Sequence, residues 1–373
     1  MKHTNKTLKR IIVKVGTSSL VSENGSLDRD KMICLIDQLA QLMKEGKEVV
    51  LVSSGAIRAG MEKLGFTERP STIPDQQASA AVGQSALMQL YTEILANYNI
   101  IPGQVLLTRD DFRNRERYLN ARNTLYTLLR FGCLPIVNEN DTVATDEIKF
   151  GENDALAALV GACLDADLVL NLSDVDGLYD QDPRSSDTCK LIEEIAEITP
   201  EIEALAGGAN GVCGSGGMKS KIEAAKIAVN SGARMVIARA GQPNVIIDAA
   251  HGKNVGTRFL SNAKGLNHRK RWIAFASRVK GSIIVNDGAK SAIMDKGKSL
   301  LSAGIVNCEG SFLVGDLVSV LDEYGNKVAR GLANYSSDEI MSIRGLKSSD
   351  IEKTLGYKGF DEVIHRDNMV IGV

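Results

Sequence analysis

The sequence lacks the features that mark zinc-binding, disulfide-rich or membrane proteins. Its 373 residues include six cysteines and four histidines. None of the cysteines forms a C-x-x-C pair, so zinc-ligand spacing is absent and nothing suggests a disulfide framework. No apolar run approaches the ~18 residues of a membrane span, and the N-terminus has no apolar stretch typical of a signal peptide. These absences predict a cytoplasmic protein.

The chain also lacks a strong excess of charge of either sign. Lysine and arginine number 44, aspartate and glutamate 46, and the net charge is −2. A nucleic-acid-binding protein with a strongly basic field is therefore not indicated. The length exceeds what one compact core usually holds, so two domains are expected. Cys34 and Cys163 lie in apolar helical patterns and are predicted to be small core residues.

Apolar runs alternate with segments of helical spacing along the first 260 residues. Strands are expected at residues 11–15, 48–52, 103–107, 134–138, 168–172 and 234–238, and helices near residues 32–43, 76–98, 154–164 and 219–230. This alternation predicts an α/β fold, a three-layer α/β/α sandwich with a mainly parallel sheet. Ligands bind such sheets beyond the carboxyl ends of the strands.

The composition and the pattern of the sequence change after about residue 260. A polar, basic segment is followed by short strand candidates at residues 282–285, 317–321 and 327–330, with turns expected at Asp287-Gly288 and Gly325-Asn326. This pattern predicts a small β-rich domain. We therefore expect a first domain over residues 1–262, a linker over 263–278 and a second domain over 279–373.

A glycine-rich stretch runs into the helix expected at residues 219–230. It consists of Ser215, Gly216, Gly217, Met218, Lys219, Ser220 and Lys221. Glycines let the backbone approach a phosphate closely, and the free N–H groups of a first helical turn can hold an anion. Met218 takes the place of a glycine, so the stretch is not a Walker A motif. A nucleotide-phosphate site and an ordinary loop before a surface helix both fit this pattern.

Lys14 stands inside the first apolar strand, shortly before Gly16. Burying an unpaired charge is costly, and a nucleotide phosphate would supply a partner. A side chain that reaches solvent is the alternative.

The stretch from Ala292 to Ser299 ends like a P-loop, but Ala292 replaces the first glycine of that motif. We therefore expect a solvated loop or the start of a helix there.

Polar residues follow two further strands. Ser54 and Gly55 come after residues 48–52, where hydroxyl and backbone N–H groups suit a carboxylate or phosphate oxygen. A plain helix cap explains them equally well. Ser173 and Asp174 come after residues 168–172 and would line a nucleotide site. A hairpin with Asp174 as a capping residue is the alternative.

Two polar clusters flank one segment between the fourth and fifth strands. Asn138 and Asp141 follow residues 134–137, and Asn153 and Asp154 open the next helix. Their carboxylate and amide oxygens suit a substrate amino group or Mg²⁺. Turn and cap chemistry is the simpler explanation of either cluster alone.

Together these motifs resemble the amino acid kinase family over about residues 10–260. Residues 13–18, 173–179 and 216–221 are shared in form by several branches, and residues 53–56 also match. Residues 80–84, 135–141 and 151–154 are similar to the branch that phosphorylates glutamate, although Glu152 stands where aspartate is usual. Residues 281–289 resemble the start of a PUA domain, which many bacterial members of that branch carry.

The resemblance implies a reaction and its partners. ATP, accompanied by Mg²⁺ held mainly by its phosphates, would phosphorylate the γ-carboxylate of L-glutamate, the first step towards proline. No metal ligand is assigned to the protein itself. Proline is expected to inhibit at or near the glutamate site, and a homo-oligomer, a dimer or tetramer, is expected.

The resemblance also assigns roles to the residues named above. Lys14 and Lys221 would neutralise the phosphoryl oxygens, and Asp154 would orient both by ion pairing. Lys219 would face away from Lys221, because two helical positions turn a side chain by about 200°. ATP would bind Lys14, Gly16, Ser173, Asp174 and the stretch from Ser215 to Lys221. Glutamate would bind Ser54, Gly55, Asn138, Asp141 and Asn153.

Two other functions compete with this interpretation. A kinase that acts on a related carboxylate, such as acetylglutamate, would share the phosphoryl chemistry. RNA binding is the second, since PUA domains occur in RNA-modifying enzymes. Residues 277–373 contain 12 lysines and arginines against 13 acidic residues, which is not the basic surface that RNA affinity relies on.

Overall fold

The computed structural model describes residues 8–22, 26–144, 153–181, 188–206, 217–261, 279–357 and 359–372. The chain forms two compact units that divide near residue 265. The linker predicted at residues 263–278 lies outside the described residues. Among the described residues, no helix has the length and apolar character needed to cross a membrane.

The first unit is built on an eight-stranded sheet with the order β3-β4-β2-β1-β5-β7-β8-β6. Its neighbouring strands are parallel except for the antiparallel pair β7 and β8. The strands are β1 (Arg10–Val15), β2 (Glu48–Val52), β3 (Pro102–Leu107), β4 (Leu134–Glu139), β5 (Leu168–Ser173), β6 (Glu194–Ile195), β7 (Arg234–Arg239) and β8 (Gly256–Phe259). The six predicted strands are all present. Strands β6 and β8 were not predicted, because each is too short to show an apolar run.

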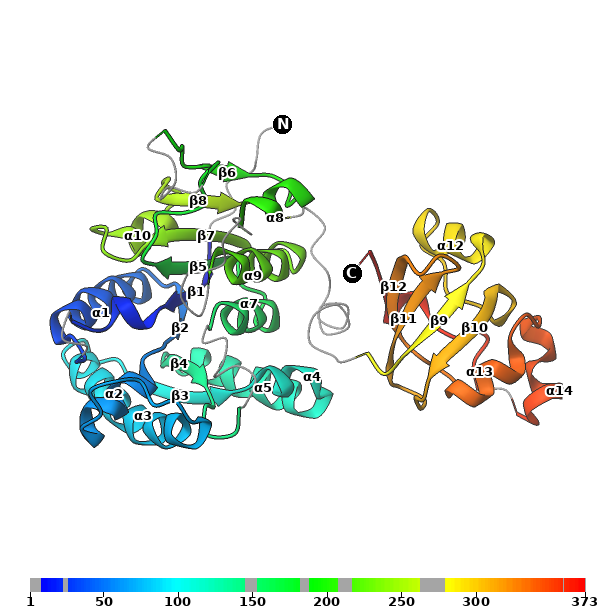
Figure 1. Ribbon diagram of the computed structural model, residues 1–373, viewed down its shortest axis with the longest axis horizontal. Helices are drawn as coiled ribbons and strands as arrows, with labels where there is room; N and C mark the ends of the chain where they lie inside the picture. Colours follow the sequence, from blue (N-terminus) through cyan, green and yellow to red (C-terminus); the bar gives the residue numbers. More distant parts are fainter. Residues whose placement is uncertain are drawn as a thin grey trace. The chain divides into compact units, whose positions relative to one another are not determined.

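Helices cover both faces of this sheet, as predicted. They are α1 (Arg29–Lys44), α2 (Ala56–Leu64), α3 (Ile73–Ala96), α4 (Arg109–Arg113), α5 (Arg115–Arg130), α7 (Asp154–Cys163), α8 (Pro200–Ala206), α9 (Met218–Asn230) and α10 (Val245–Ala250). Figure 1 shows α1 and α10 on one side of the sheet and α5, α7 and α9 on the other. Cys163 is buried in α7, but Cys34 is exposed on α1. The prediction that Cys34 is a core residue was wrong, because Met32, Leu35 and Ile36 already fill the face of α1 that points toward the core.

The alternation of side chains along β1 decides where its lysine points. Ile11, Val13 and Val15 belong to the core that includes α1, α3 and α10. Successive side chains of a strand face opposite sides of the sheet. Ile12 and Lys14 therefore face the other layer, and Ile12 lies next to Gly161 of α7. Lys14 thus points toward the helix that begins at Asp154.

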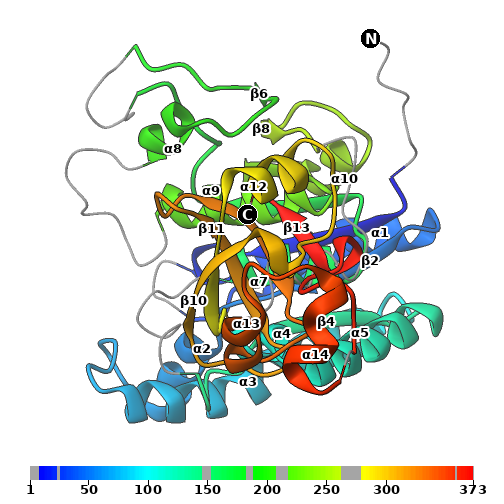
Figure 2. The same cartoon turned by 90° about the vertical axis from the view of Figure 1, so that its right-hand side faces the viewer.

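Helices α2 and α3 lie side by side (Figures 1 and 2), and two glycines form the contact between them. A Cβ atom placed on Gly60 would lie 1.7 Å from the backbone oxygen of Ser79. A Cβ atom on Gly83 would lie 1.8 Å from the backbone oxygen of Ala56. Both contacts are with backbone atoms, which cannot rotate away as a side chain can. The close packing of α2 on α3 therefore requires glycine at both positions.

The second unit contains a five-stranded sheet with the order β10-β9-β11-β12-β13. Its elements are β9 (Gly281–Val285), α12 (Asp287–Met294), β10 (Ile305–Gly310), β11 (Leu317–Asp322), β12 (Lys327–Leu332), α13 (Ser337–Ile343), α14 (Ile351–Leu355) and β13 (Met369–Ile371). Within this unit, α12 lies at the opposite end from α13 and α14 (Figures 1 and 2). The three strands expected in this part of the chain are present.

One local prediction in the second unit was wrong. Asp287-Gly288 is the first turn of α12 rather than a strand-to-strand turn, because Asn286 caps that helix by accepting a hydrogen bond from the Ala289 backbone N–H. The stretch that begins at Ala292 holds the end of α12 and then an exposed loop, so of the two predicted alternatives the solvated loop is confirmed and the helix start is not. Lys290 of α12 forms a 2.8 Å ion pair with buried Asp322, which holds the helix against the sheet.

We predict that Gly83→Ala weakens the packing of α2 on α3. The added methyl group meets backbone atoms, so the helices must separate, and overpacking of this kind costs about 1–3 kcal/mol of unfolding free energy. Urea denaturation measures the change. Val82→Ala, at an exposed position of the same helix, is the control and should stay within about 0.5 kcal/mol of the unchanged protein. Equal stability of the two variants would contradict the packing role of Gly83.

Candidate functional site

The carboxyl ends of four adjacent strands, β4, β2, β1 and β5, meet at one edge of the sheet. The chain builds β2 on one side of β1 and later places β5 on the other side. Open α/β sheets bind ligands where the strand order reverses in this way. The turns that follow these strands carry Gly16, Ser54, Asp141 and Asp174. The predicted site residues are therefore gathered at the switch point of the sheet.

Lys14, Asp154 and Lys221 form a buried cluster at this edge. The Nζ atom of Lys14 lies 2.6 Å from one carboxylate oxygen of Asp154, and the Nζ atom of Lys221 lies 3.2 Å from the other. Asp154 is fully buried, and the two lysine side chains are at most 7% exposed. The three side chains come from β1, α7 and α9. Among these three side chains there are two cations and one carboxylate, a balance that suits an anionic ligand.

Helix α9 begins at Met218, directly after the glycine-rich stretch. Gly217 occupies its N-cap position, and no side chain caps the first turn. The Ser220 hydroxyl donates to Asp154 Oδ2 at 2.9 Å, so this serine belongs to the same cluster. Lys219 is exposed whereas Lys221 is buried, and the two lysines therefore face apart. Ser215 and Gly216 lie outside the described residues.

Helix α2 begins in a similar way after β2. Gly55 is its N-cap residue, with a left-handed φ of 95° that strongly favours glycine. No side chain caps the helix, so Ser54 is not acting as a plain helix cap. The free backbone N–H groups of the first turn are suited to an anionic oxygen. The anion-binding alternative is therefore the better fit to this segment.

A chain of side-chain amides joins β4, α7 and β2. Asn153 Nδ2 donates to the Ser53 backbone oxygen, to Ser54 Oγ at 3.2 Å and to Asn138 Oδ1 at 2.8 Å. Asn153 holds the N-cap position of α7, but its side chain does not cap that helix. Both ends of the Asn138 amide are bonded within the protein. Asp141 lies in the turn after β4, two residues beyond the strand.

On the other side of Lys14, the end of β5 carries Ser173 and Asp174. The Ser173 hydroxyl donates to Asp174 Oδ1 at 3.0 Å, and Asp174 itself is exposed. Beyond them, Arg239 at the end of β7 donates two hydrogen bonds to Asp176, at 2.7 and 3.0 Å. This contact lowers the pKa of Asp176, which stays ionised at neutral pH. Asp176 and Arg239 therefore form an ion pair beside the carboxyl end of β5.

Three side chains of the site were not predicted from the sequence. Gln84 of α3 accepts a 2.8 Å hydrogen bond from Asn138, and Tyr91 of α3 shares one of 2.8 Å with Ser53. Burial raises the pKa of Tyr91, so its hydroxyl stays protonated. Asn171 lies in register with Lys14, and its amide has no hydrogen-bond partner among the described residues. A polar residue in an apolar strand was the available signal for Asn171. The motif at residues 80–84 pointed to Gln84.

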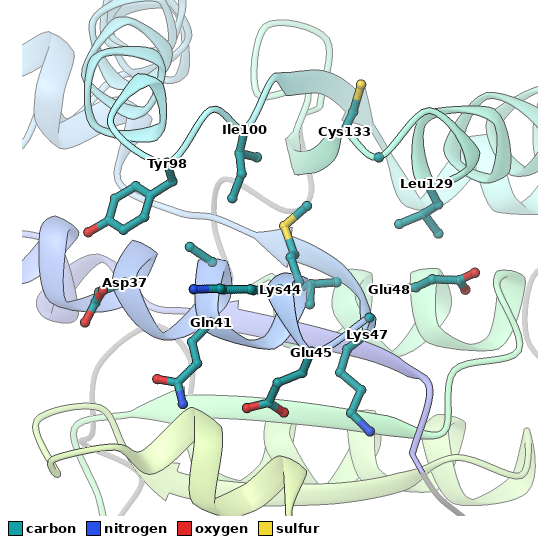
Figure 3. A pocket seen from close by; sticks show the side chains of 15 residues that line it. Asp37, Gln41, Lys44, Glu45, Lys47, Glu48, Tyr98, Ile100, Leu129 and Cys133 are labelled. Atoms are coloured by element: carbon teal, nitrogen blue, oxygen red, sulfur yellow. The ribbon is translucent and has the colours of Figure 1, made fainter.

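A cleft of about 1120 Å³ lies at the opposite edge of the sheet (Figure 3). Lys44 and Glu45 at the end of α1 line it, together with Glu48 at the start of β2 and Cys133 just before β4. These are the amino ends of the strands. None of the predicted site residues borders this cleft, which is therefore distinct from the lysine cluster.

We predict that Asp154→Ala destabilises the protein strongly. The change leaves Lys14 and Lys221 buried without their shared counter-charge, and breaking a buried ion pair from one side costs about 3–5 kcal/mol. Urea unfolding measures the loss. Glu203→Ala is the matched control, because it breaks the exposed pair with Lys226, which is worth at most about 1 kcal/mol. A loss at Asp154 no larger than that of the control would show that the cluster does not support the fold.

Comparison with known proteins identifies both units. The amino acid kinase family model matches residues 9–239, and the PUA domain model matches residues 281–355. A glutamate 5-kinase of Thermoanaerobacter sp. (strain X514) is 51% identical over 97% of this chain and 97% of its own length. The glutamate 5-kinase of Moorella thermoacetica is 47% identical over 97% of this chain and 96% of its own. That of Carboxydothermus hydrogenoformans is 47% identical over the full length of both chains.

These matches confirm the predicted fold class, the kinase activity and the β-rich second domain. The relatives span nearly the whole chain, so both units are shared with them. The chain belongs to the amino acid kinase family and, within it, to the glutamate 5-kinases.

Proposed function

We propose that this enzyme transfers the γ-phosphoryl group of ATP to the γ-carboxylate of L-glutamate. The observation that carries the proposal is the buried pair of lysines on Asp154, placed at the switch point of the sheet. The names of the full-length relatives support glutamate as the substrate. The product is γ-glutamyl phosphate, a mixed anhydride suited to reduction on the way to proline.

The chemical difficulty of this reaction is electrostatic. The γ-carboxylate is ionised at neutral pH, so it needs no general base to attack. It must approach a phosphoryl group that is itself negative, and charge spreads over the transferred oxygens in the transition state. Lys14 and Lys221 supply positive charge that is already in position, because Asp154 holds each amino group before the substrates arrive. Gly16 lets the backbone after β1 approach the phosphates closely.

The glutamate site is assigned to the side of Lys14 that faces β2 and β4. Ser54, Gly55 and the first turn of α2 suit a carboxylate of the substrate. Asp141 suits the α-ammonium group by its charge. Asn153 lies between these groups and presents its Oδ1 atom on the side away from its three accepting partners. Asn138 is bonded at both ends, which favours a supporting role.

The nucleotide is assigned to the other side of Lys14. The start of α9, from Gly217 to Lys221, is proposed to bind the ATP phosphates. Ser215 and Gly216 lie outside the described residues and are assigned to the nucleotide by the family resemblance. Ser173 and Asp174 line the nucleotide side. Mg²⁺ would be bound mainly by the ATP phosphates and would offset their charge. The nearest buried acid, Asp154, has its oxygens engaged by Lys14, Lys221 and Ser220, which fits a role in holding the lysines.

Regulation and assembly complete the proposal. Proline resembles glutamate in its α-carboxylate and α-nitrogen, so it is the expected inhibitor at or near the glutamate site. A homo-oligomer and a cytoplasmic location are proposed from the family resemblance. RNA binding by the PUA domain has little support, because the near-zero net charge of this domain does not provide the basic surface that RNA affinity relies on.

ADP release with glutamate tests the proposed reaction. We expect turnover with L-glutamate, little with N-acetylglutamate, and a lower rate when proline is added. N-acetylglutamate has no charged ammonium group to pair with Asp141, so its kcat/KM should fall by at least about tenfold. Faster turnover of N-acetylglutamate than of glutamate would contradict the proposed substrate.

Two of the three lysines of α9 provide a matched pair of variants. Lys221→Ala removes a buried cation of the cluster, and we expect kcat to fall by about 10²–10³. Lys226→Ala removes a partly exposed lysine of the same helix that lies outside the proposed site, and its kcat should remain within about threefold of the unchanged enzyme. Circular dichroism would check that both variants are folded. Similar losses in the two variants would show that the phosphoryl role does not belong to Lys221.

A further inference from the structure

Gln84 is a buried polar residue of α3 to which the proposed mechanism gives no role. The residue is 9% exposed, and its Oε1 atom accepts a 2.8 Å hydrogen bond from Asn138 Nδ2. Its Nε2 atom has no hydrogen-bond partner among the described residues. Gln84 follows Gly83, whose close contact with Ala56 fixes α3 against the start of α2. The position of the Gln84 side chain is therefore set by the packing of two helices.

The directions of the amides next to Gln84 follow from two backbone groups. The Glu139 backbone N–H can only donate, so the atom of Asn138 that it meets at 2.9 Å must be Oδ1. The Ser53 backbone carbonyl can only accept, so the atom of Asn153 that it meets must be Nδ2. Asn138 Nδ2 must then face α3, where Gln84 offers an acceptor. The donor and acceptor directions of these hydrogen bonds are therefore mutually consistent from the end of β2, through Asn153 and Asn138, to Gln84 on α3.

We propose that Gln84 is a positioning residue for the amino acid substrate, acting through Asn138 on Asn153. With Oε1 of Gln84 in place, Asn138 is held at both ends, and its Oδ1 atom is fixed where it accepts from Asn153 Nδ2. Asn153 then keeps all its donor contacts on one side, and its Oδ1 atom faces the substrate. The inference rests on the proposed function of the site.

Loss of the Gln84 acceptor would leave a buried donor of Asn138 unsatisfied. Such a group costs enough free energy to drive a local rearrangement, in this case rotation of Asn138 away from its contact with Asn153. The substrate half of the site would then lose its order, while the nucleotide half would not. The hydrogen bond of Gln84 goes to Asn138 on β4, whereas Ser173, Asp174 and Lys221 lie at the end of β5 and on α9.

Two substitutions of Gln84 separate its acceptor from its unpartnered donor. Gln84→Met keeps the length of the side chain but removes both polar atoms. Gln84→Glu keeps an acceptor oxygen in either protonation state and replaces Nε2. We expect Gln84→Met to raise KM for glutamate about tenfold, with KM for ATP changed less than twofold. Gln84→Glu should restore KM for glutamate to within about threefold.

The measurement is steady-state ADP release with each substrate varied in turn. Gln89→Met, at an exposed position of the same helix, is the control and should leave both KM values unchanged. Thermal unfolding of the Gln84 variants shows whether they are folded at the assay temperature. A purely structural role would move both KM values of Gln84→Met together, and that outcome overturns the proposal. Equal defects in Gln84→Met and Gln84→Glu would overturn it as well.

The unchanged enzyme separates this inference from the proposed function. If it fails to release ADP with glutamate, the proposed substrate is wrong, whatever the variants do. If it turns over glutamate and Gln84→Met retains a normal KM, the reaction stands and the positioning role of Gln84 is wrong.

Discussion

The shared carboxylate of Asp154 is the interaction on which the catalytic unit depends. Three segments far apart in the sequence, β1, α7 and α9, each place one charged side chain in the same buried volume. Removal of Asp154 would leave two buried lysines without their counter-charge in a region from which water is excluded, whereas removal of either lysine would leave a one-to-one ion pair. The arrangement thus links the fold to the chemistry, since the contacts that hold the helices to the sheet also hold two cations where phosphoryl charge would develop.

The site has two halves because the sheet has a switch point. The turns after β2 and β4 and the start of α7 supply amides, hydroxyls and free N–H groups on one side of Lys14. The turns after β5 and β7 supply Ser173 and the pair of Asp176 and Arg239 on the other. In the proposed function, an amino acid and a nucleotide would approach the two lysines from opposite sides, with a γ-carboxylate oxygen directed at the γ-phosphorus.

Much of the fold could be predicted because its strands are apolar and long. Runs such as residues 48–52 and 168–172 are visible in the sequence, and the strand-end rule then gathers their polar neighbours. Short elements such as β6 could not be found, because two residues carry no period. Cys34 shows the converse limit. Apolar residues at helical spacing indicate a helix, but whether a given residue is buried depends on its position around the helix axis.

The lysine cluster was predictable in outline, and the amide chain was not. Lys14 stands out as a charge within an apolar strand, Lys221 follows a glycine-rich stretch, and the family resemblance implied that Asp154 pairs with both. Gln84 and Tyr91 lie within an ordinary helix, and their partners Asn138 and Ser53 are distant in sequence. Contacts of that kind depend on how helices pack on a sheet, which the local pattern does not contain.

The two glycines between α2 and α3 have a consequence for how the enzyme accommodates its substrate. Helix α2 begins at the turn that suits a substrate carboxylate, and α3 carries the glutamine that supports the opposite wall. Since their backbones touch directly at Gly60 and Gly83, no side chains lie between the two helices at this contact that could rearrange to absorb a relative movement. The two walls must then shift as a single rigid body, and a ligand that displaces one helix displaces the other with it.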